Sequence, residues 1–129
     1  MDVKKHIIIS SGEVNVTAQM NDTDTAAAIY ELLPLERTVN RWGDELHFAV
    51  PVFIEPEQDA TEFVEVGDLG YWPVGDSFCI FCGKTPYSID DRPRACGPVT
   101  VIGRITGDVD ALTTLHKGDN IRIEHKQDH

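Results

Sequence analysis

Short runs of alternating apolar and polar residues recur along the chain, and most of them end at Gly, Pro, Asn or Asp. In the run 13–19, every second residue from Val14 to Ala18 is apolar, which is the period of a strand with one buried face. Together with 3–10 it predicts a β-hairpin that turns at 11–12. The same criteria predict further strands at 36–42, 45–50, 63–66, 77–82, 99–105 and 120–125.

One segment has the helical period instead. Asp22, Thr23 or Asp24 can accept hydrogen bonds from the free amides of a first helical turn, and Pro34 ends the helix because proline lacks an amide proton. The apolar face of this helix would consist of Ala26, Ile29, Tyr30 and Leu33. A shorter second helix is predicted at 108–116.

These elements predict a mainly β protein with a single domain spanning residues 1–129, because no repeat or low-complexity linker divides the chain. Eight short strands and two short helices favour a closed eight-stranded β-barrel. Closure removes exposed sheet edges, whereas an open α/β sheet would need a helix after nearly every strand.

The charge balance narrows the possible partners. The chain carries 22 acidic and 11 basic residues, a formal net charge of -11, so phosphate backbones and anionic lipid surfaces are repelled. We therefore expect no nucleic acid and no membrane as partners. The apolar run after Lys5 is too short for a signal peptide, and three cysteines form no disulfide framework, so we expect a cytoplasmic protein.

Two motifs suggest metal or nucleotide chemistry, and neither has the required context. Cys79 and Cys82 would point to opposite faces of one strand, so they cannot share a zinc ion, and the default is that they pack as small apolar groups. Lys84 and Thr85 resemble the end of a phosphate-binding loop, but Phe78 stands where that loop needs glycine. The histidines have no metal-ligand spacing. We expect no metal and no cofactor.

Aromatic residues gather beside glycines and prolines between 66 and 86, a mixture typical of a concave ligand site. We predict a pocket with apolar walls, a polar anchor and a lid formed by the loop 87–98. The alternative is that the aromatic residues fill the barrel core and that 84–85 is a solvated turn. The predicted walls are Trp42, Phe48, Tyr71, Trp72 and Phe81, and the candidate anchors are Arg41, Lys84, Thr85 and Arg92.

Three motifs in this order resemble the small prokaryotic cyclophilin-like family of uncharacterised proteins. They are Asn40 to Phe48, Gly67 to Pro73, and Phe81 to Pro86, and the likeness extends over nearly the whole chain. The resemblance implies an eight-stranded closed barrel with helices at its ends. It does not imply isomerase activity, because the Phe-His-Arg context of the catalytic arginine in true cyclophilins is missing from this sequence.

Three functions are compatible with these patterns. The first is a binding domain that holds a small molecule or peptide in a pocket at the side of the barrel. The alternative is a peptidyl-prolyl cis-trans isomerase with an atypical active site, which needs no nucleophile to lower the barrier of peptide-bond rotation. The third is a protein partner of a larger enzyme, because cyclophilin-like barrels resemble parts of amide-bond-hydrolysing assemblies.

Overall fold

The first hairpin forms where the alternating pattern predicts it. The structure is a computed structural model that describes residues 5–126, and in it β1 (Lys5–Ser11) pairs with β2 (Val14–Met20) in antiparallel register. Gly12 in the turn has a φ of 56°, a conformation that glycine adopts at little cost. Residues 3 and 4 of the predicted strand lie outside the described residues.

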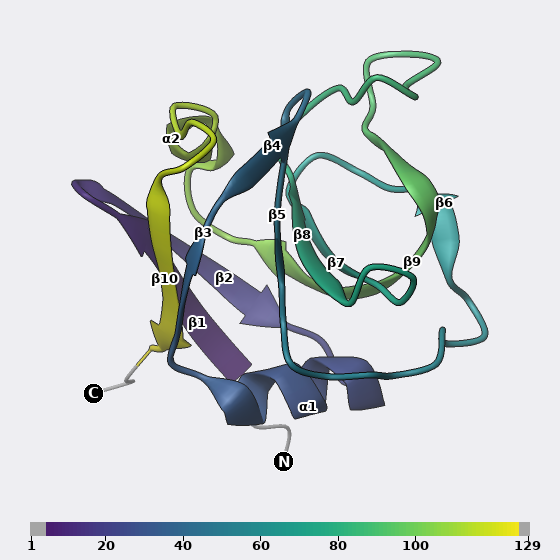
Figure 1. Cartoon of the computed structure of the whole chain (residues 1–129), viewed down its shortest axis with the longest axis horizontal. Helices are drawn as coiled ribbons and strands as arrows, with labels where there is room; N and C mark the ends of the chain where they lie inside the picture. The colour runs from purple at the N-terminus through teal and green to yellow at the C-terminus, as the bar shows by residue number, and fades with distance from the viewer. Residues whose placement is uncertain (1–4, 127–129) are drawn as a thin grey trace.

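The long helix also follows from its local sequence. It is α1 (Asp24–Leu32), and the Thr23 side chain accepts a hydrogen bond from the amide of Ala26 at 3.1 Å, which makes Thr23 the N-cap. Its apolar face closes one end of the sheet (Figure 1). The second helix, α2 (Val109–Leu112), is shorter than the predicted 108–116 and is capped by Asp108.

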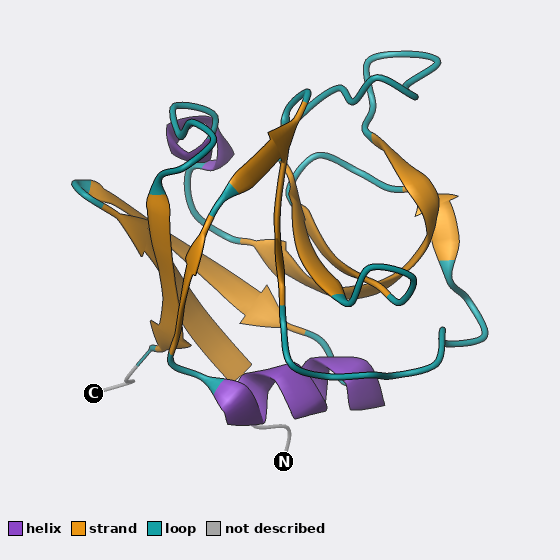
Figure 2. Cartoon of the chain, viewed as in Figure 1, coloured by secondary structure: helices purple, strands orange, loops and turns teal. Residues whose placement is uncertain are grey.

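The remaining strands complete one antiparallel sheet (Figure 2). They are β3 (Leu35–Thr38), β4 (Asn40–Trp42), β5 (Glu45–Ala49), β6 (Thr61–Phe63), β7 (Asp68–Trp72), β8 (Ser77–Phe81), β9 (Arg94–Ile105) and β10 (Asn120–His125). Their order is β3-β10-β1-β2-β9-β7-β8-β5-β4, and β6 pairs with β9 beside this path. The mainly β class with two helices is confirmed.

The strand count differs from the predicted eight. Residues 5–126 contain ten strands, and the hydrogen-bonded path begins at β3 and ends at β4 without closing, so the closed eight-stranded barrel is not confirmed. The predicted strand 36–42 is divided at Val39, whose amide and carbonyl bond to the turn before β10. The added strand β7 was missed because Gly67, Gly70 and Pro73 indicated turns.

Two predicted boundaries also moved. The strand expected at 63–66 is β6 at Thr61–Phe63, and the strand expected at 99–105 begins earlier, at Arg94. Gly97 and Pro98 indicated a turn there. In the structure they lie inside a long strand whose pairing with β6 shifts register between Thr61 and Phe63, the kind of irregularity that tolerates proline.

Strand β8 is covered by apolar side chains on both faces. Phe78 and Ile80 of β8 point into the main core, which also contains residues of β1, β2, β10 and α1. Cys79 and Phe81 point the other way, into a smaller cluster with Val64, Ala95 and Val99. Strand β9 curls over this second face, as the green ribbon at the right of Figure 1 shows, and creates room for a site outside the main core.

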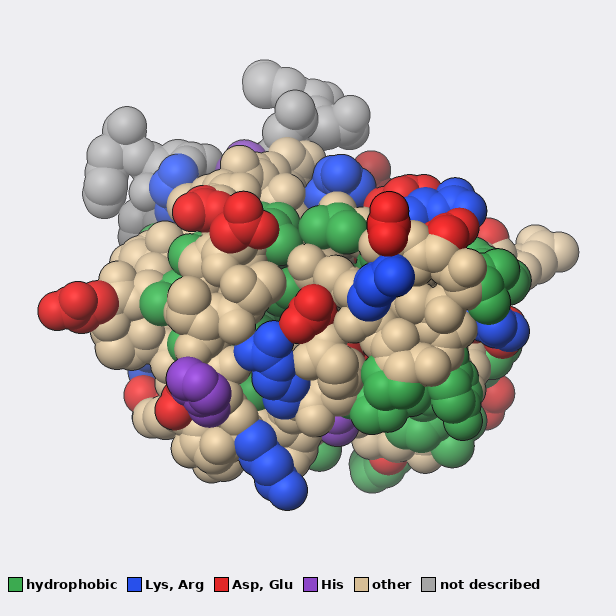
Figure 3. Space-filling model, turned by 90° about the horizontal axis from the view of Figure 1, so that it is seen from above, with side chains coloured by type: hydrophobic (Ala, Val, Ile, Leu, Met, Phe, Trp, Pro, Cys, Tyr) green, Lys and Arg blue, Asp and Glu red, His purple; other side chains and the backbone are tan. Residues whose placement is uncertain are grey.

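Charged side chains of both signs are interspersed over the face seen from above, and hydrophobic side chains gather in one part of it (Figure 3). Among the residues that the structure describes, neither helix has the length and apolar character needed to span a bilayer.

Candidate functional site

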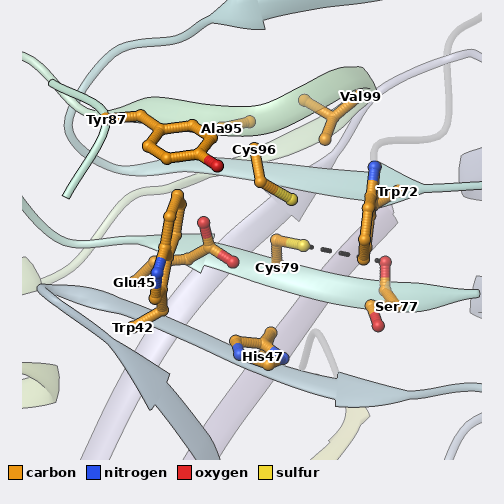
Figure 4. A pocket seen from close by; sticks show the side chains of 10 residues that line it. All are labelled: Trp42, Glu45, His47, Trp72, Ser77, Cys79, Tyr87, Ala95, Cys96 and Val99. Atoms are coloured by element: carbon orange, nitrogen blue, oxygen red, sulfur yellow. Dashed lines mark hydrogen bonds between the residues drawn. The ribbon is translucent and has the colours of Figure 1, made fainter. Parts of the chain in front are cut away.

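A pocket of about 300 Å³ lies between the outer face of β5 and β8 and the curled start of β9 (Figure 4). We call it the side pocket. Its walls come from β4, β5, β7, β8, β9 and the loop before β9, so segments far apart in the sequence meet there. It is lined by Trp42, Glu45, His47, Trp72, Ser77, Cys79, Tyr87, Ala95, Cys96 and Val99.

The floor of the side pocket is formed by β5 and β8. Glu45 and His47 share one face of β5, because side chains two apart on a strand point the same way. Ser77 and Cys79 share the corresponding face of β8, and the register places His47 opposite Cys79. The floor is therefore a patch of four polar or polarisable side chains on an otherwise apolar surface.

Aromatic rings form the walls on either side of that floor. Trp42 and Tyr87 meet edge to face, with ring centroids 4.9 Å apart and an interplanar angle of 80°. Trp72 stands on the opposite side, with Cys79 and Cys96 between it and the pair (Figure 4). A ligand in this space would contact aromatic surface on two sides.

Two glycines determine how Trp72 is seated. A Cβ at Gly75 would lie 2.6 Å from Cζ3 of the indole, and a Cβ at Gly97 would lie 3.2 Å from its Nε1. A larger residue at position 75 would displace the ring, and one at position 97 would press on it. The indole Nε1 is buried and has no hydrogen-bond partner among the described residues, so one donor at the pocket wall is left unsatisfied.

Glu45 is the strongest electrostatic feature of the pocket. Its side chain is 5% exposed, and burial raises its pKa from 4.5 to about 7, while a hydrogen bond with the Cys79 thiol opposes the shift. Burial lowers the pKa of His47. The carboxyl of Glu45 can therefore change charge near neutral pH.

The two thiols in the pocket are poor nucleophiles. Burial, with the nearby Glu45 and Cys96, raises the pKa of Cys79 well above its usual value. Burial, with the charge of Glu45, also raises the pKa of Cys96. Because the thiolate is the reactive form, this arrangement does not favour covalent catalysis. As the alternation predicted, Cys82 lies on the other face, in the main core.

Of the predicted pocket walls, Trp42 and Trp72 line the side pocket. The other three are fully buried and pack the core. Phe48 stacks on Phe78 with ring centroids 5.2 Å apart, and Phe81 belongs to the cluster beneath the pocket. The hydroxyl of Tyr71 donates to the carbonyl of Val52 at 3.0 Å and so fastens the segment after β5.

None of the four predicted anchors lines the side pocket. The guanidinium of Arg41 donates to the carbonyls of Gly43, Thr113 and Leu115 and pairs with Asp44 at 2.6 Å. It ties the β4–β5 turn to the segment after α2.

The other three anchors belong to the loop before β9. Thr85 is buried, and its hydroxyl donates to the carbonyl of Arg94 and accepts from the amide of Tyr87. Lys84 is exposed and lies 3.5 Å from Asp91, and Arg92 is exposed and pairs with Asp90 at 2.8 Å. The contacts of Thr85 fix the start of this loop to β9, whereas Lys84 and Arg92 pair only on the surface.

The predicted lid 87–98 is partly a loop and partly strand β9, which begins at Arg94. Tyr87 at its start and Cys96 within the strand reach the side pocket. The intervening residues are held by a hydrogen bond from the Ser88 hydroxyl to the carbonyl of Arg92 at 2.7 Å.

The sequence contained a signal for the residues that were missed. In 45–49, Glu45 and His47 alternate with the buried Leu46 and Phe48, so one face of this strand is apolar and the other carries titratable groups. The histidines lack metal-ligand spacing, so His47 was not singled out, and Cys79 was expected to pack as a small apolar group. Only the pairing of β5 with β8 brings the polar faces together, and nothing local in the sequence indicates it.

Comparison with known proteins agrees with this architecture. Residues 5–124 match the family model described as Cyclophilin-like. The solution structure of a hypothetical protein from Archaeoglobus fulgidus is similar, with a TM-score of 0.80, 32% sequence identity and coverage of 98% of each chain. No curated protein matches the chain. Both the family model and the structural neighbour cover nearly the full length, and the chain belongs to the cyclophilin-like family.

Proposed function

We propose that the protein is a binding domain and that its side pocket holds a small molecule or a peptide side chain. The observation that supports this most directly is the hollow of about 300 Å³ between two tryptophans and a tyrosine, with a buried carboxyl at its floor. Ligand pockets typically combine apolar and aromatic walls with few polar groups, and this volume is at the small end of their range, which begins at about 300 Å³.

The unsatisfied indole of Trp72 adds to the argument. A buried donor without a partner costs about 1–3 kcal/mol, and a ligand recovers part of this free energy if its binding turns the indole so that Nε1, which is buried beside Gly97, reaches the side pocket. Gly75 and Gly97 leave room for the indole at the edge of the pocket, where a residue with a side chain would crowd it. An indole held at the edge of a pocket with an unpaired donor is expected where the ring contacts a ligand.

We also propose that the sheet acts as a closed barrel. The two ends of the hydrogen-bonded path, β3 and β4, are separated in the chain by Val39 alone. If β3 and β4 are taken as one strand that bends at Val39, the first and last strands of the path are the same strand, and the sheet has no free edge at this point. Closure would hold β5 and β8 rigid beneath the side pocket.

The isomerase alternative receives no comparable support. Among the described residues, no arginine lines the side pocket. The guanidinium of Arg41 is already hydrogen-bonded to backbone carbonyls and paired with Asp44. We expect no acceleration of X-Pro isomerisation in a proline-containing peptide. Acceleration that Arg41→Ala abolishes would favour the isomerase over the binding domain.

The binding function is tested by native mass spectrometry of freshly purified protein and by tryptophan fluorescence during titration with benzyl alcohol. We expect Trp72→Ala to weaken binding by about tenfold, because an aromatic wall of this kind contributes on the order of 1 kcal/mol or more. Val74→Ala is the matched control, since Val74 is 81% exposed and outside the side pocket. If Trp72→Ala lost fold and binding equally, Trp72 would be a packing residue.

A further inference from the structure

Over the residues that the structure describes, the side pocket contains an acidic side chain and no Lys or Arg. Its ten lining residues include one carboxylate, Glu45, and neither Lys nor Arg occurs among them in the described chain. The neighbouring cations are engaged elsewhere, Arg41 with carbonyls and Asp44, and Lys84 near Asp91. The chain as a whole carries a net charge of -11, so its field attracts cations. The described pocket lining therefore lacks a lysine or arginine that could pair with an anion.

Glu45 lacks a charged partner. Within residues 5–126 no ion pair involves it, and the thiol of Cys79 beside it is a weak donor that lies 3.8 Å from the carbonyl of Ser77. A buried ionised carboxylate without a partner is costly in free energy. A cation entering the pocket would remove this cost by pairing with the carboxylate.

The aromatic walls suit the same kind of ligand. In Figure 4 the rings of Trp42 and Trp72 are seen edge-on from either side of the pocket, so their faces turn toward the space between them. The face of an indole carries the negative part of its quadrupole and attracts ammonium groups, more strongly where water is excluded. Tyr87 supplies a third ring beside Trp42.

We propose that the side pocket binds the ammonium group of a small organic amine, paired with Glu45 and held between the two indoles. The proposal rests on the binding function inferred above and names the chemical class of the ligand. A small amine fits better than a folded partner, because the hollow of about 300 Å³ has room for a molecule with a single ring.

Binding of the amine depends on the ionisation of Glu45. The titratable groups that face it are His47 on the same strand, Cys79 on β8, Cys96 on β9 and Tyr87 of the loop. Burial lowers the pKa of His47 and raises the pKa of both thiols, so Glu45 is the group among these that changes charge near pH 7. Affinity for the amine rises as the pH rises through this range.

The test is calorimetric titration of the full chain with benzylamine, benzyl alcohol and benzoate, which share one ring and differ in charge. At about pH 8 we expect benzylamine to bind about tenfold more tightly than benzyl alcohol, from the cation–π contact and the carboxylate together, and benzoate not to bind. The preference for benzylamine should shrink at about pH 6, where Glu45 is protonated. Glu45→Gln should abolish the preference, and Glu13→Gln, at an exposed position, should leave it intact.

The outcomes separate this inference from the binding function. If benzyl alcohol or benzoate binds as tightly as benzylamine at about pH 8, or if Glu45→Gln keeps the preference, the amine specificity is wrong while the pocket still binds ligands. If no probe binds, the binding function itself is contradicted. If Glu45→Gln does not fold, the comparison of the two pH values in the unmodified protein decides.

Discussion

Glu45 and Phe48 lie three positions apart on β5 and have opposite environments. The ring of Phe48 is buried in the main core against Phe78, whereas the carboxyl of Glu45 faces the side pocket. The difference follows from the alternation of side chains along a strand. The titratable groups of β5 are therefore concentrated on one face, and the other face packs in the main core.

The buried carboxyl makes the stability of the protein depend on pH. Burial raises the pKa of Glu45 from 4.5 to about 7, so the folded state binds a proton that the unfolded state releases between these values. The free energy of unfolding contributed by this group is fully present below pH 4.5 and falls as the pH rises through about 7. At higher pH, Glu45→Gln should be more stable than the unmodified protein by about 3 kcal/mol at most.

Urea unfolding at about pH 5 and about pH 8 measures this effect. Glu13→Gln is the control, because it removes an exposed carboxyl and should leave the pH dependence unchanged. Equal pH dependence in Glu45→Gln and the unmodified protein would mean that the Glu45 carboxyl is hydrated.

At the scale of elements, Arg41 connects two parts of the chain that no strand pairing joins. Its guanidinium bonds to the carbonyls of Thr113 and Leu115, at 2.7 and 2.6 Å, in the segment that follows α2. Helix C-terminal carbonyls lack intrahelical partners, so this contact satisfies groups that would otherwise need water. The planar guanidinium can bond several acceptors at once, which lysine cannot do.

Replacing Arg41 should therefore destabilise the fold more than replacing Arg92. We expect Arg41→Ala to lower the free energy of unfolding by about 2–4 kcal/mol, since hydrogen bonds to charged groups contribute about 1.5–3 kcal/mol each and part of the loss is recovered by water. Arg92→Ala should change it by less than about 0.5 kcal/mol, because Arg92 is exposed and pairs only on the surface. Urea unfolding of both variants tests this, and equal effects would contradict the structural role of Arg41.

The elements that could be predicted are those that local sequence defines. The hairpin β1–β2 and helix α1 have a clear period and a capping residue, and β10 has the predicted bounds. Strand β7 could not be predicted because Gly70 is needed there for packing against residues distant in the sequence, not for a turn. A Cβ at Gly70 would lie 3.0 Å from Phe81 and 3.2 Å from Val99, so Gly70 provides clearance for the second cluster rather than a turn.

On the scale of the whole molecule, the path of β9 creates the side pocket. Its second half pairs with β7 and β2, and its first half pairs with β6 and curls over the outer face of β8. This places Ala95, Cys96 and Val99 opposite Ser77 and Cys79 across the hollow (Figure 4). The site therefore exists only when the sheet is complete.

The net charge of -11 should make the stability of the whole molecule depend on salt. Self-repulsion destabilises a compact state of high net charge, and salt screens it. Raising NaCl from about 0.01 M to about 0.1 M shortens the Debye length from about 30 Å to about 10 Å, so we expect the urea midpoint of unfolding to rise. A midpoint that fell with salt would mean that surface ion pairs such as Arg92 with Asp90 outweigh the repulsion.

The sequence by itself determined the mainly β class, the first hairpin, helix α1, the negative net charge and the family, because period, caps, charge and ordered motifs are local or additive properties. It also singled out Trp42 and Trp72, and both line the side pocket. Only the tertiary structure decided that Glu45, His47 and Cys79 share a floor and that Arg41 and Thr85 hold loops in place. The reason is that strand pairing and the curl of β9 depend on contacts between residues distant in the sequence, and these contacts leave no periodic signal in any one segment.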